Sequence, residues 1–361
     1  MAAGDAPLTY FPPPESKGGW RAALSGASGL DPAALDAARA WNAAHDVPSS
    51  LVVIHRGALV AEFCERGATP EATFNVYSCS KSFTGTAYGI LFDALEGATP
   101  DAPAYLLIPA GAPLTDPRKE RITLRHLLSM SSGIPGERIG VYGVRVPEGA
   151  DPFEAALGHA PVLTREGGKE VSVARLAGEP GTVWDYSDPA FAHLSLAFRA
   201  LAGMDLAPYM AERVFSPIGL ESVSWDEMGV PGGRIGAHTM PFAGVHITAR
   251  DFARFGYLML RGGVWAGRQL VPAGWIERAS TTSQPMNPGY GLTWWTNAAG
   301  TLWPGVPRDA FAAMGFNCNL CCAIPSLDLV IVRIGLGPTQ STEVIAAPLL
   351  RALSQAATPT I

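Results

Sequence analysis

The sequence predicts an α+β fold in which both ends of the chain build one antiparallel sheet. Strand-like runs lie near the two ends, at 51–63 and 291–335, whereas helical patterns and many Pro and Gly residues fill the middle. Strands so far apart in sequence form one sheet most simply when helices flank it and the central part is inserted. We therefore expect a sheet domain from 1–95 and 245–361, a mostly helical inserted subdomain at 96–244, and a ligand cleft between them.

The N-terminal part carries clear local signals. Residues 31–45 have the pattern of a helix, with Asp31 as a candidate N-cap and Pro32 in the first helical position. Two β-rich runs within 51–63 flank Arg56–Gly57, which favours the tight turn of a hairpin. We expect these two strands to pair with each other.

The remaining elements follow from the spacing of apolar residues. Helical spacing occurs in 78–95, 124–130, 187–204, 249–263 and 343–356. Strand-like runs occur at 291–297, 311–325 and 329–335, and the PSLD stretch between the last two suits a hairpin turn.

Composition and charge exclude several classes of protein. The 361 residues are 48% hydrophobic and 16% charged, as in a globular protein, and the net charge is −6 without a cluster of Lys or Arg. Nucleic acid is therefore not an expected partner. We recognise no signal peptide and no apolar run of about 18 residues, so we expect a cytoplasmic protein that does not enter a membrane. The five cysteines lack metal-ligand spacing and are expected as free thiols, with adjacent Cys321 and Cys322 on opposite faces of a strand.

The stretch SCSKS (78–82) contains a candidate nucleophile and base. A serine hydroxyl attacks at neutral pH only with a base within hydrogen-bond reach. Ser78 has Lys81 three residues on, and residues with this spacing lie on nearly the same face of a helix, whereas Ser80 and Ser82 point elsewhere. A Ser-x-x-Lys spacing also arises by chance in surface helices, so it needs support from another part of the chain.

Support comes from Tyr186, in the stretch WDYSDPAFAHLS (184–195). A tyrosine on a tight turn before a helix is placed to direct its hydroxyl into a cleft. The alternative is a tyrosine that packs at the helix entry, with Asp188 as the N-cap.

Several stretches together resemble the serine β-lactamase and penicillin-binding-protein superfamily. They are FNVYSCSKSFTG (74–85), ITLRHLLSMSSGI (122–134), WDYSDPAFAHLS (184–195), ITARDFARFGYLMLRGGVWAGRQLV (247–271), GYGLTWW (289–295) and AMGFNCNL (313–320). Within the superfamily the chain is most similar to class C-like, β-lactamase-related hydrolases, which include esterases, D-amino-acid peptidases and amidases, and 6-aminohexanoate-dimer hydrolases. The resemblance implies the β-lactamase/transpeptidase-like fold, which agrees with the architecture expected above.

The resemblance also implies roles for individual residues. Ser78 would be the acylated nucleophile, and Lys81 and Tyr186 would form the base system. The backbone N–H groups of Ser78 and Phe316 would form the oxyanion hole, and Gly315 would border the substrate. No cofactor and no metal is implied.

Two motifs depart from the family's pattern. The second motif is usually Tyr-x-Asn, and Asp188 in its third place can accept a hydrogen bond from the lysine but cannot donate an amide N–H to a substrate. The third motif, Lys-Thr-Gly or His-Thr-Gly in β-lactam binders, is Ala-Met-Gly at 313–315. The chain has no lysine after Lys169, and Arg308 or Arg333 would replace it only with unusual geometry. We therefore expect a substrate that is neutral at this position, an ester or amide rather than a penicillin.

A few further residues are candidates for substrate contacts. Tyr142 falls where related 6-aminohexanoate-oligomer hydrolases carry a substrate-contacting tyrosine, although a packed loop tyrosine explains it equally well. Trp303, like Trp294 and Trp295, precedes the proposed oxyanion strand, where aromatic rings could wall an apolar acyl pocket. The seven histidines lack ligand spacing and are expected to be structural.

The sequence thus predicts a serine hydrolase that cleaves small carboxylic esters or amides through an acyl-enzyme on Ser78. An amidase or peptidase for amino-acid amides or oligoamides, and an acyltransferase, would use the same residues. A β-lactamase lacks its expected cation, and a non-catalytic sensor is disfavoured because Ser78, Lys81 and Tyr186 are all present. The partner is a small molecule, and the sequence leaves open whether the chain forms a homo-oligomer.

Overall fold

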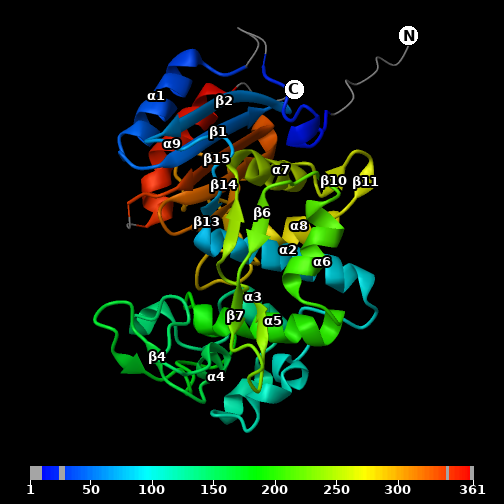
Figure 1. Cartoon of the computed structure of the whole chain (residues 1–361), viewed down its shortest axis with the longest axis vertical. Helices are drawn as coiled ribbons and strands as arrows, with labels where there is room; N and C mark the ends of the chain where they lie inside the picture. The colour runs from blue at the N-terminus through cyan, green and yellow to red at the C-terminus, as the bar shows by residue number, and fades with distance from the viewer. Residues whose placement is uncertain (1–9, 24–28, 339–340, 358–361) are drawn as a thin grey trace.

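A six-stranded antiparallel sheet built from both ends of the chain forms the upper part of the protein (Figure 1). The computed structural model describes residues 10–23, 29–338 and 341–357. In the order in which they lie side by side, the strands are β12 (Trp295–Thr296), β13 (Phe311–Gly315), β14 (Asn319–Ile324), β15 (Leu329–Gly335), β1 (Ser49–His55) and β2 (Ala58–Glu65). The two chain ends meet where β15 pairs with β1.

Tight turns set the pairing of the strands. β1 and β2 form the predicted hairpin, and Arg56 and Gly57 at its turn have φ values of 52° and 71°. Two successive left-handed residues are typical of a type I′ turn, whose twist matches that of the strands. The run at 311–325 is not one strand but two, β13 and β14, and Asn317 and Cys318 in the turn between them also have positive φ.

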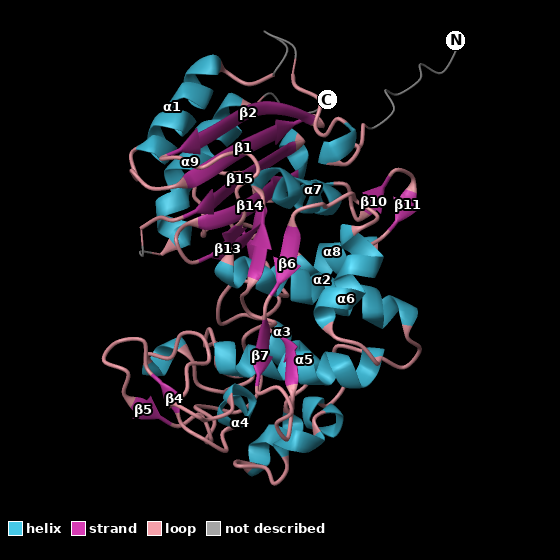
Figure 2. Cartoon of the chain, in the orientation of Figure 1, coloured by secondary structure: helices cyan, strands magenta, loops and turns pink. Residues whose placement is uncertain are grey.

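Helices cover both faces of the sheet (Figures 1 and 2). On one face lie α1 (Pro32–Ala43) and α9 (Thr342–Ala356), and on the other lies α7 (Ala249–Leu260). Strand side chains alternate between two hydrophobic clusters: Leu51 and Cys322 belong to the cluster with α9, and Val52 and Cys321 to the larger cluster with α7. The expectation that Cys321 and Cys322 face opposite sides is confirmed.

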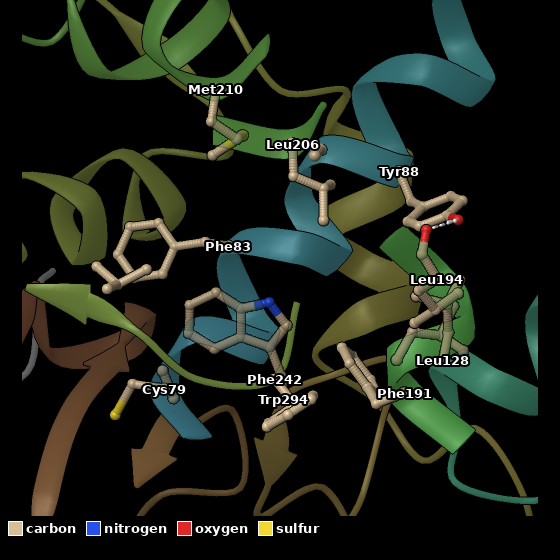
Figure 3. Packing of buried hydrophobic residues seen from close by; sticks show 14 of the residues in the cluster. Cys79, Phe83, Tyr88, Leu128, Phe191, Leu194, Leu206, Met210, Phe242 and Trp294 are labelled. Atoms are coloured by element: carbon tan, nitrogen blue, oxygen red, sulfur yellow. Dashed lines mark hydrogen bonds between the residues drawn. The ribbon is translucent and has the colours of Figure 1, made fainter. Parts of the chain in front are cut away.

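Helix α2 (Ser80–Ala94) runs through the larger hydrophobic cluster, which joins the sheet to the inserted region. Figure 3 shows Phe83 of this helix together with Phe242 and Trp294 among the buried side chains of the cluster. Every residue of the helix from Ser80 to Leu91 is buried. The helix therefore has no exposed polar face in this part, and packing against surrounding side chains holds it in place. This packing gives the start of α2 a rigid setting.

The stretch 96–244, expected to be an inserted subdomain, contains less helix than predicted. Its helices are α3 (Leu124–Leu128), α4 (Pro152–Leu157), α5 (Asp188–Ala202) and α6 (Leu206–Met210). Of these, α3, α4 and α5 lie below α2 in Figure 1. Its strand pairs are β4 (Val162–Leu163) with β5 (Glu170–Val171) and β7 (Glu227–Gly229) with β8 (Ala237–Thr239). Loops fill much of the remainder, because frequent Pro and Gly residues interrupt regular structure.

Small elements complete the fold. They are the three-stranded sheet of β3 (Phe74–Asn75), β9 (Val245–Ile247) and β6 (Val223–Trp225), the pair β10 (Val264–Trp265) and β11 (Arg268–Gln269), and helix α8 (Ala273–Ala279). Within the described ranges, no helix has the length and apolar character needed to cross a bilayer.

Candidate active site

Ser78 lies where the chain leaves β3 and enters α2. A short 3₁₀ turn, Tyr77–Cys79, precedes the helix, and Tyr77 adopts a φ of 48°. This left-handed conformation is unfavourable for a bulky side chain and concentrates at functional sites. The Asn75 side chain holds the turn by accepting a 2.7 Å hydrogen bond from the Tyr77 N–H. Ser78 is thereby fixed at the start of the helical segment, where backbone N–H groups lack intrahelical acceptors.

Lys81 lies three residues after Ser78 and is only 1% exposed. Its Nζ donates hydrogen bonds to Ser78 Oγ, at 2.9 Å, and to the carbonyl oxygen of Phe242, at 3.2 Å. Oδ1 of Asp188 lies 2.6 Å from the same Nζ, and the ring centroid of Tyr186 lies 4.5 Å away. The Ser-x-x-Lys spacing therefore does bring the two side chains into contact, in a buried and fully partnered setting.

Tyr186 reaches the same hydroxyl from the turn that precedes α5. Its side chain is hydrogen-bonded to Ser78, and its ring stacks on Trp295 with 6.0 Å between centroids. Burial and, in second place, the charge of Asp188 raise the pKa of Tyr186 well above its usual range, whereas the hydrogen bond with Ser78 lowers it. The phenol is thus protonated in the resting site and held in one orientation by the neighbouring rings.

Gly315 ends β13 directly beside the start of α2. A Cβ atom at this position would lie 2.1 Å from the carbonyl oxygen of Val76 and 3.1 Å from the Ser78 nitrogen, so the strand comes this close only with glycine. Phe316 follows, and its ring packs edge-to-face on Tyr77 at 5.6 Å. The start of α2 and the end of β13 therefore border the same space, as an oxyanion hole of Ser78 and Phe316 requires.

Asp188 is not the N-cap of α5. The Ser187 hydroxyl has that place and accepts a 3.1 Å hydrogen bond from the N–H of Ala190. The Asp188 carboxylate lies instead between two donors, with Oδ1 2.6 Å from Lys81 Nζ and Oδ2 accepting a 2.6 Å hydrogen bond from the N–H of Gly143. It therefore connects the buried lysine to a loop of the inserted region.

The other nucleophile candidates near Ser78 have structural roles. Burial raises the pKa of the Cys79 thiol well above its usual range, so the reactive thiolate is disfavoured. The Ser80 hydroxyl accepts a 3.1 Å hydrogen bond from a backbone N–H, and the Ser82 hydroxyl donates at 2.8 Å to a backbone carbonyl. Both serines are buried, whereas Ser78 lines the cleft described next.

A cleft of about 830 Å³ opens at Ser78 and has walls from both parts of the chain. Its aromatic and charged walls are formed by Tyr77, Tyr142, Trp184, Tyr186, Phe242, Trp295, Phe316, Glu137, Arg145, Arg165, Asp188 and Glu343. Of the predicted substrate contacts, Tyr142, Asp188 and Gly315 line this cleft. Its volume suits a small organic molecule.

Trp303 does not line the cleft, which corrects the sequence-based prediction. Its side chain is fully buried in the cluster with α9, and its indole N–H donates to the carbonyl oxygen of Glu343 at 3.2 Å. Trp295 forms the cleft wall instead, and Trp294 packs in the larger core. The loop between β12 and β13 carries Trp303 to the α9 face, and its path has no signature in the sequence.

Sequence reasoning missed the charged cleft residues Glu137, Arg145, Arg165 and Glu343. Glu137 is accessible to solvent within the cleft, but the surrounding walls and, next, the charge of Asp188 raise its pKa to about 7. The Arg165 guanidinium lies 4.4 Å from the centroid of the Phe316 ring. Glu137 and Arg165 are on or beside irregular segments outside any motif, and only the folded chain brings them towards Ser78.

In the part of the chain that the structure describes, no three His, Cys, Asp or Glu side chains are grouped so as to hold a metal ion. All five cysteines are free thiols, and four of them are buried.

The fold and the contacts of Ser78 are those of a serine hydrolase. The chain belongs to the beta-lactamase family, whose model matches residues 33–334. It is 25% identical over 320 residues to the 6-aminohexanoate-dimer hydrolase of Paenarthrobacter ureafaciens, covering 81% of this chain and 74% of the relative. The family resemblance seen in the sequence is confirmed.

Two solved structures show the same fold. One, a family VIII carboxylesterase, has a TM-score of 0.65 and 19% identity, covering 91% of this chain and 98% of that chain. The other, EstCE1, a hydrolase with promiscuous acyltransferase activity, has a TM-score of 0.65 and 15% identity, covering 90% of this chain and 97% of the other. At these identities the likeness establishes the architecture, and the expected α+β fold is confirmed.

Proposed function

We propose that this serine hydrolase cleaves small carboxylic esters or amides through an acyl-enzyme on Ser78. The observation that carries the proposal is one hydroxyl in contact with two groups that can handle its proton, Lys81 Nζ at 2.9 Å and the phenol of Tyr186. The hydroxyl opens into a cleft of about 830 Å³ with aromatic walls, which suit an acyl chain or a ring.

In the proposed mechanism the reactive form of the site is the one in which the pair of Lys81 and Tyr186 lacks one proton. Ser78 Oγ attacks the carbonyl carbon of the substrate, and the proton of Ser78 passes to that pair. The pair protonates the leaving alcohol or amine, so that the C–O or C–N bond breaks and an ester on Ser78 remains. Water then attacks this ester, gives its proton to the pair and releases the carboxylic acid, while Ser78 Oγ regains a proton. The amine lies 4.5 Å from the centroid of the phenol ring, so both groups are close enough to Ser78 to handle its proton.

The proposed oxyanion hole consists of the backbone N–H groups of Ser78 and Phe316. The close approach of Gly315 to the start of α2 supports this assignment, since it brings the two peptide segments together. Donors of this kind stabilise the charge that develops on the carbonyl oxygen, and the loss of one typically costs about 10² to 10³ in rate.

Asp188 is proposed as a positioning residue rather than a substrate contact. Both of its oxygens face protein donors, Lys81 Nζ on one side and the Gly143 N–H on the other. An asparagine would direct its NH₂ group at one of these donors, so only a carboxylate suits both. The carboxylate thereby connects the base system to the cleft wall that contains Tyr142, and this role replaces the predicted substrate contact.

An amide is the second candidate substrate, and the named activity of the Paenarthrobacter relative favours it. Acyl transfer is a variant of the same chemistry, in which an alcohol or amine replaces water in the second step. A homo-oligomer stays a prediction, which light scattering on the purified protein tests.

A panel of p-nitrophenyl esters and amino-acid p-nitroanilides tests the proposed function. We expect ester turnover by the wild type and its loss in Ser78→Ala. Turnover of the anilides would assign the amidase activity as well. A Ser78→Ala protein as active as the wild type would contradict the proposal.

A further inference from the structure

Arg165 lines the cleft, and its guanidinium lies close to two aromatic rings. Its guanidinium carbon is 4.4 Å from the ring centroid of Phe316 and 5.3 Å from that of Tyr142, and all three residues line the cleft. The backbone is anchored as well, because the Arg165 N–H donates to the carbonyl oxygen of Gly140 at 2.9 Å. The guanidinium is therefore held next to the residue whose N–H we assign to the oxyanion hole.

Among the described residues, no carboxylate forms an ion pair with the exposed guanidinium of Arg165. Arg118 and Arg250, by contrast, are paired with Asp116 and Glu62. The side chain of Arg165 contacts the faces of two aromatic rings instead. A guanidinium stacked on rings keeps the N–H groups at its edge available, and that planar fork matches a carboxylate.

We propose that the substrate carries a carboxylate, on its acyl or its leaving side, and that Arg165 binds it. The inference rests on the proposed function, since it names a substrate class for the same cleft. It also revises the sequence-based expectation of a neutral substrate, which followed from the missing lysine of the third motif. Arg333 does not supply the cation, because it is buried and donates to the carbonyl oxygen of Asn317. Arg165 brings a cation to the same strand end from the inserted region.

The competing possibility is a cationic substrate bound by Glu137 and Glu343, which also line the cleft. A carboxyl group whose pKa is about 7 is only partly ionised at neutral pH, which makes Glu137 a weaker fixed charge than an arginine. The cleft wall also contains a second guanidinium, that of Arg145, so its two arginines favour a carboxylate-bearing substrate over a cationic one.

Two matched substrate series test the proposal. The acyl series consists of the p-nitrophenyl monoesters of adipate and of its carboxamide analogue, together with p-nitrophenyl 6-aminohexanoate. The leaving-group series consists of 4-carboxyphenyl and 4-carbamoylphenyl hexanoate. The readout is the ratio of kcat/KM for the carboxylate over the carboxamide, measured within each protein. Arg165→Gln is compared with the wild type and with Arg175→Gln, which removes an exposed arginine outside the cleft wall.

We expect a ratio of about tenfold or more in at least one series for the wild type, as a charge-assisted contact provides. The ratio should fall towards one in Arg165→Gln and stay at the wild-type value in Arg175→Gln. In Arg165→Glu the ester with the highest kcat/KM in the acyl series should be p-nitrophenyl 6-aminohexanoate, whose ammonium group suits a carboxylate. A misfolded protein cannot show this gain in activity. A wild-type ratio near one in both series, or a ratio that survives Arg165→Gln, overturns the proposal. The carboxamide ester tests the proposed function independently of the carboxylate proposal: its hydrolysis by the wild type, and the loss of that hydrolysis in Ser78→Ala, would establish the serine hydrolase activity.

Discussion

Lys81 and Asp188 form a buried ion pair, with 2.6 Å between Nζ and Oδ1, next to the Ser78 hydroxyl. Their side chains are 1% and 12% exposed. The carboxylate compensates the cost of burying the ammonium, and removing one partner of such a pair leaves an uncompensated charge. Through the hydrogen bond from Gly143, the same carboxylate extends the base system into the wall of the cleft.

Replacing Asp188 by asparagine should impair turnover, although asparagine is common in this motif in the family. The NH₂ group of the substituted amide would face one of two donors, so one contact to Lys81 or Gly143 is lost. We expect kcat for a neutral ester to fall about tenfold or more, as the loss of a hydrogen bond to a charged group implies, with a smaller change in KM. Steady-state kinetics and the pH–rate profile measure this effect.

The control for that variant is Asp93→Asn, which changes an exposed carboxylate near the end of α2. We expect wild-type kinetics for this control. A positioning role predicts that Asp188→Asn changes the pH–rate profile as well as kcat. Wild-type kcat with an unchanged profile would show that the carboxylate has no such role.

Removing the amine of Lys81 should nearly abolish turnover. Lys81→Met keeps a long side chain in the buried site but cannot exchange a proton with Ser78, so kcat/KM should fall by about 10² to 10⁴. Lys169→Met, which changes an exposed lysine of the inserted region, is the matched control. Both variants should have the circular dichroism spectrum of the wild type. Lys81→Met activity within threefold of the wild type would exclude the amine from the base system.

A methyl group at Gly315 should disturb the proposed oxyanion hole. The Cβ of Gly315→Ala would meet the carbonyl oxygen of Val76 at 2.1 Å, so β13 must move away from the start of α2. We expect the acylation rate to fall by roughly 10² or more, which pre-steady-state kinetics with a p-nitrophenyl ester measures. Gly274→Ala in α8 is the control, because its Cβ meets only the flexible end of Arg278 at 3.7 Å. Equal acylation rates for both variants would argue against the assignment.

Glu137 should make the folded protein less stable as the pH rises. Partial desolvation by the surrounding walls of the cleft and the neighbouring carboxylates of Asp188, Asp185 and Glu343 raise its pKa from 4.5 to about 7, with Lys81 opposing the shift. Between these two values the folded state binds the proton more tightly than the unfolded state, so stability declines as the pH rises from 4.5 to 7. Glu137→Gln removes this decline.

Thermal unfolding at several pH values measures the effect of Glu137. The Tm of Glu137→Gln relative to the wild type should increase from about pH 5 to about pH 8, a range that spans the raised pKa. Glu120→Gln, an exposed carboxylate outside the cleft wall, should show no such trend. A Tm difference that is constant across this range would mean that the Glu137 carboxyl has an ordinary pKa.

Local chemistry explains which parts of the fold could be predicted. The N-cap at Asp31 and the Arg56–Gly57 turn depend on neighbouring residues only, and both are where the sequence places them. The division of 311–325 into two strands was missed because both β13 and β14 are buried on both faces. The side chains of such strands show no apolar–polar alternation, so periodicity does not mark their ends, although Asn317 is a turn-type residue within the run.

The candidate site divides in the same way. Contact between Ser78 and Lys81 follows from one turn of helix, so sequence spacing predicts it. The hydrogen bond from Gly143 to Asp188 and the contact between Arg165 and the Phe316 ring depend on the conformation of loops in the inserted region. Loop paths are set by tertiary packing, and a single sequence carries little information on them.

The central claim, acylation of Ser78, is tested most directly by intact-mass spectrometry after treatment with a fluorophosphonate, followed by peptide mapping. The account predicts one adduct per chain, on Ser78, that forms in the wild type and in Ser80→Ala but is absent in Ser78→Ala. An adduct on another serine, or none on the folded wild-type protein, would contradict it.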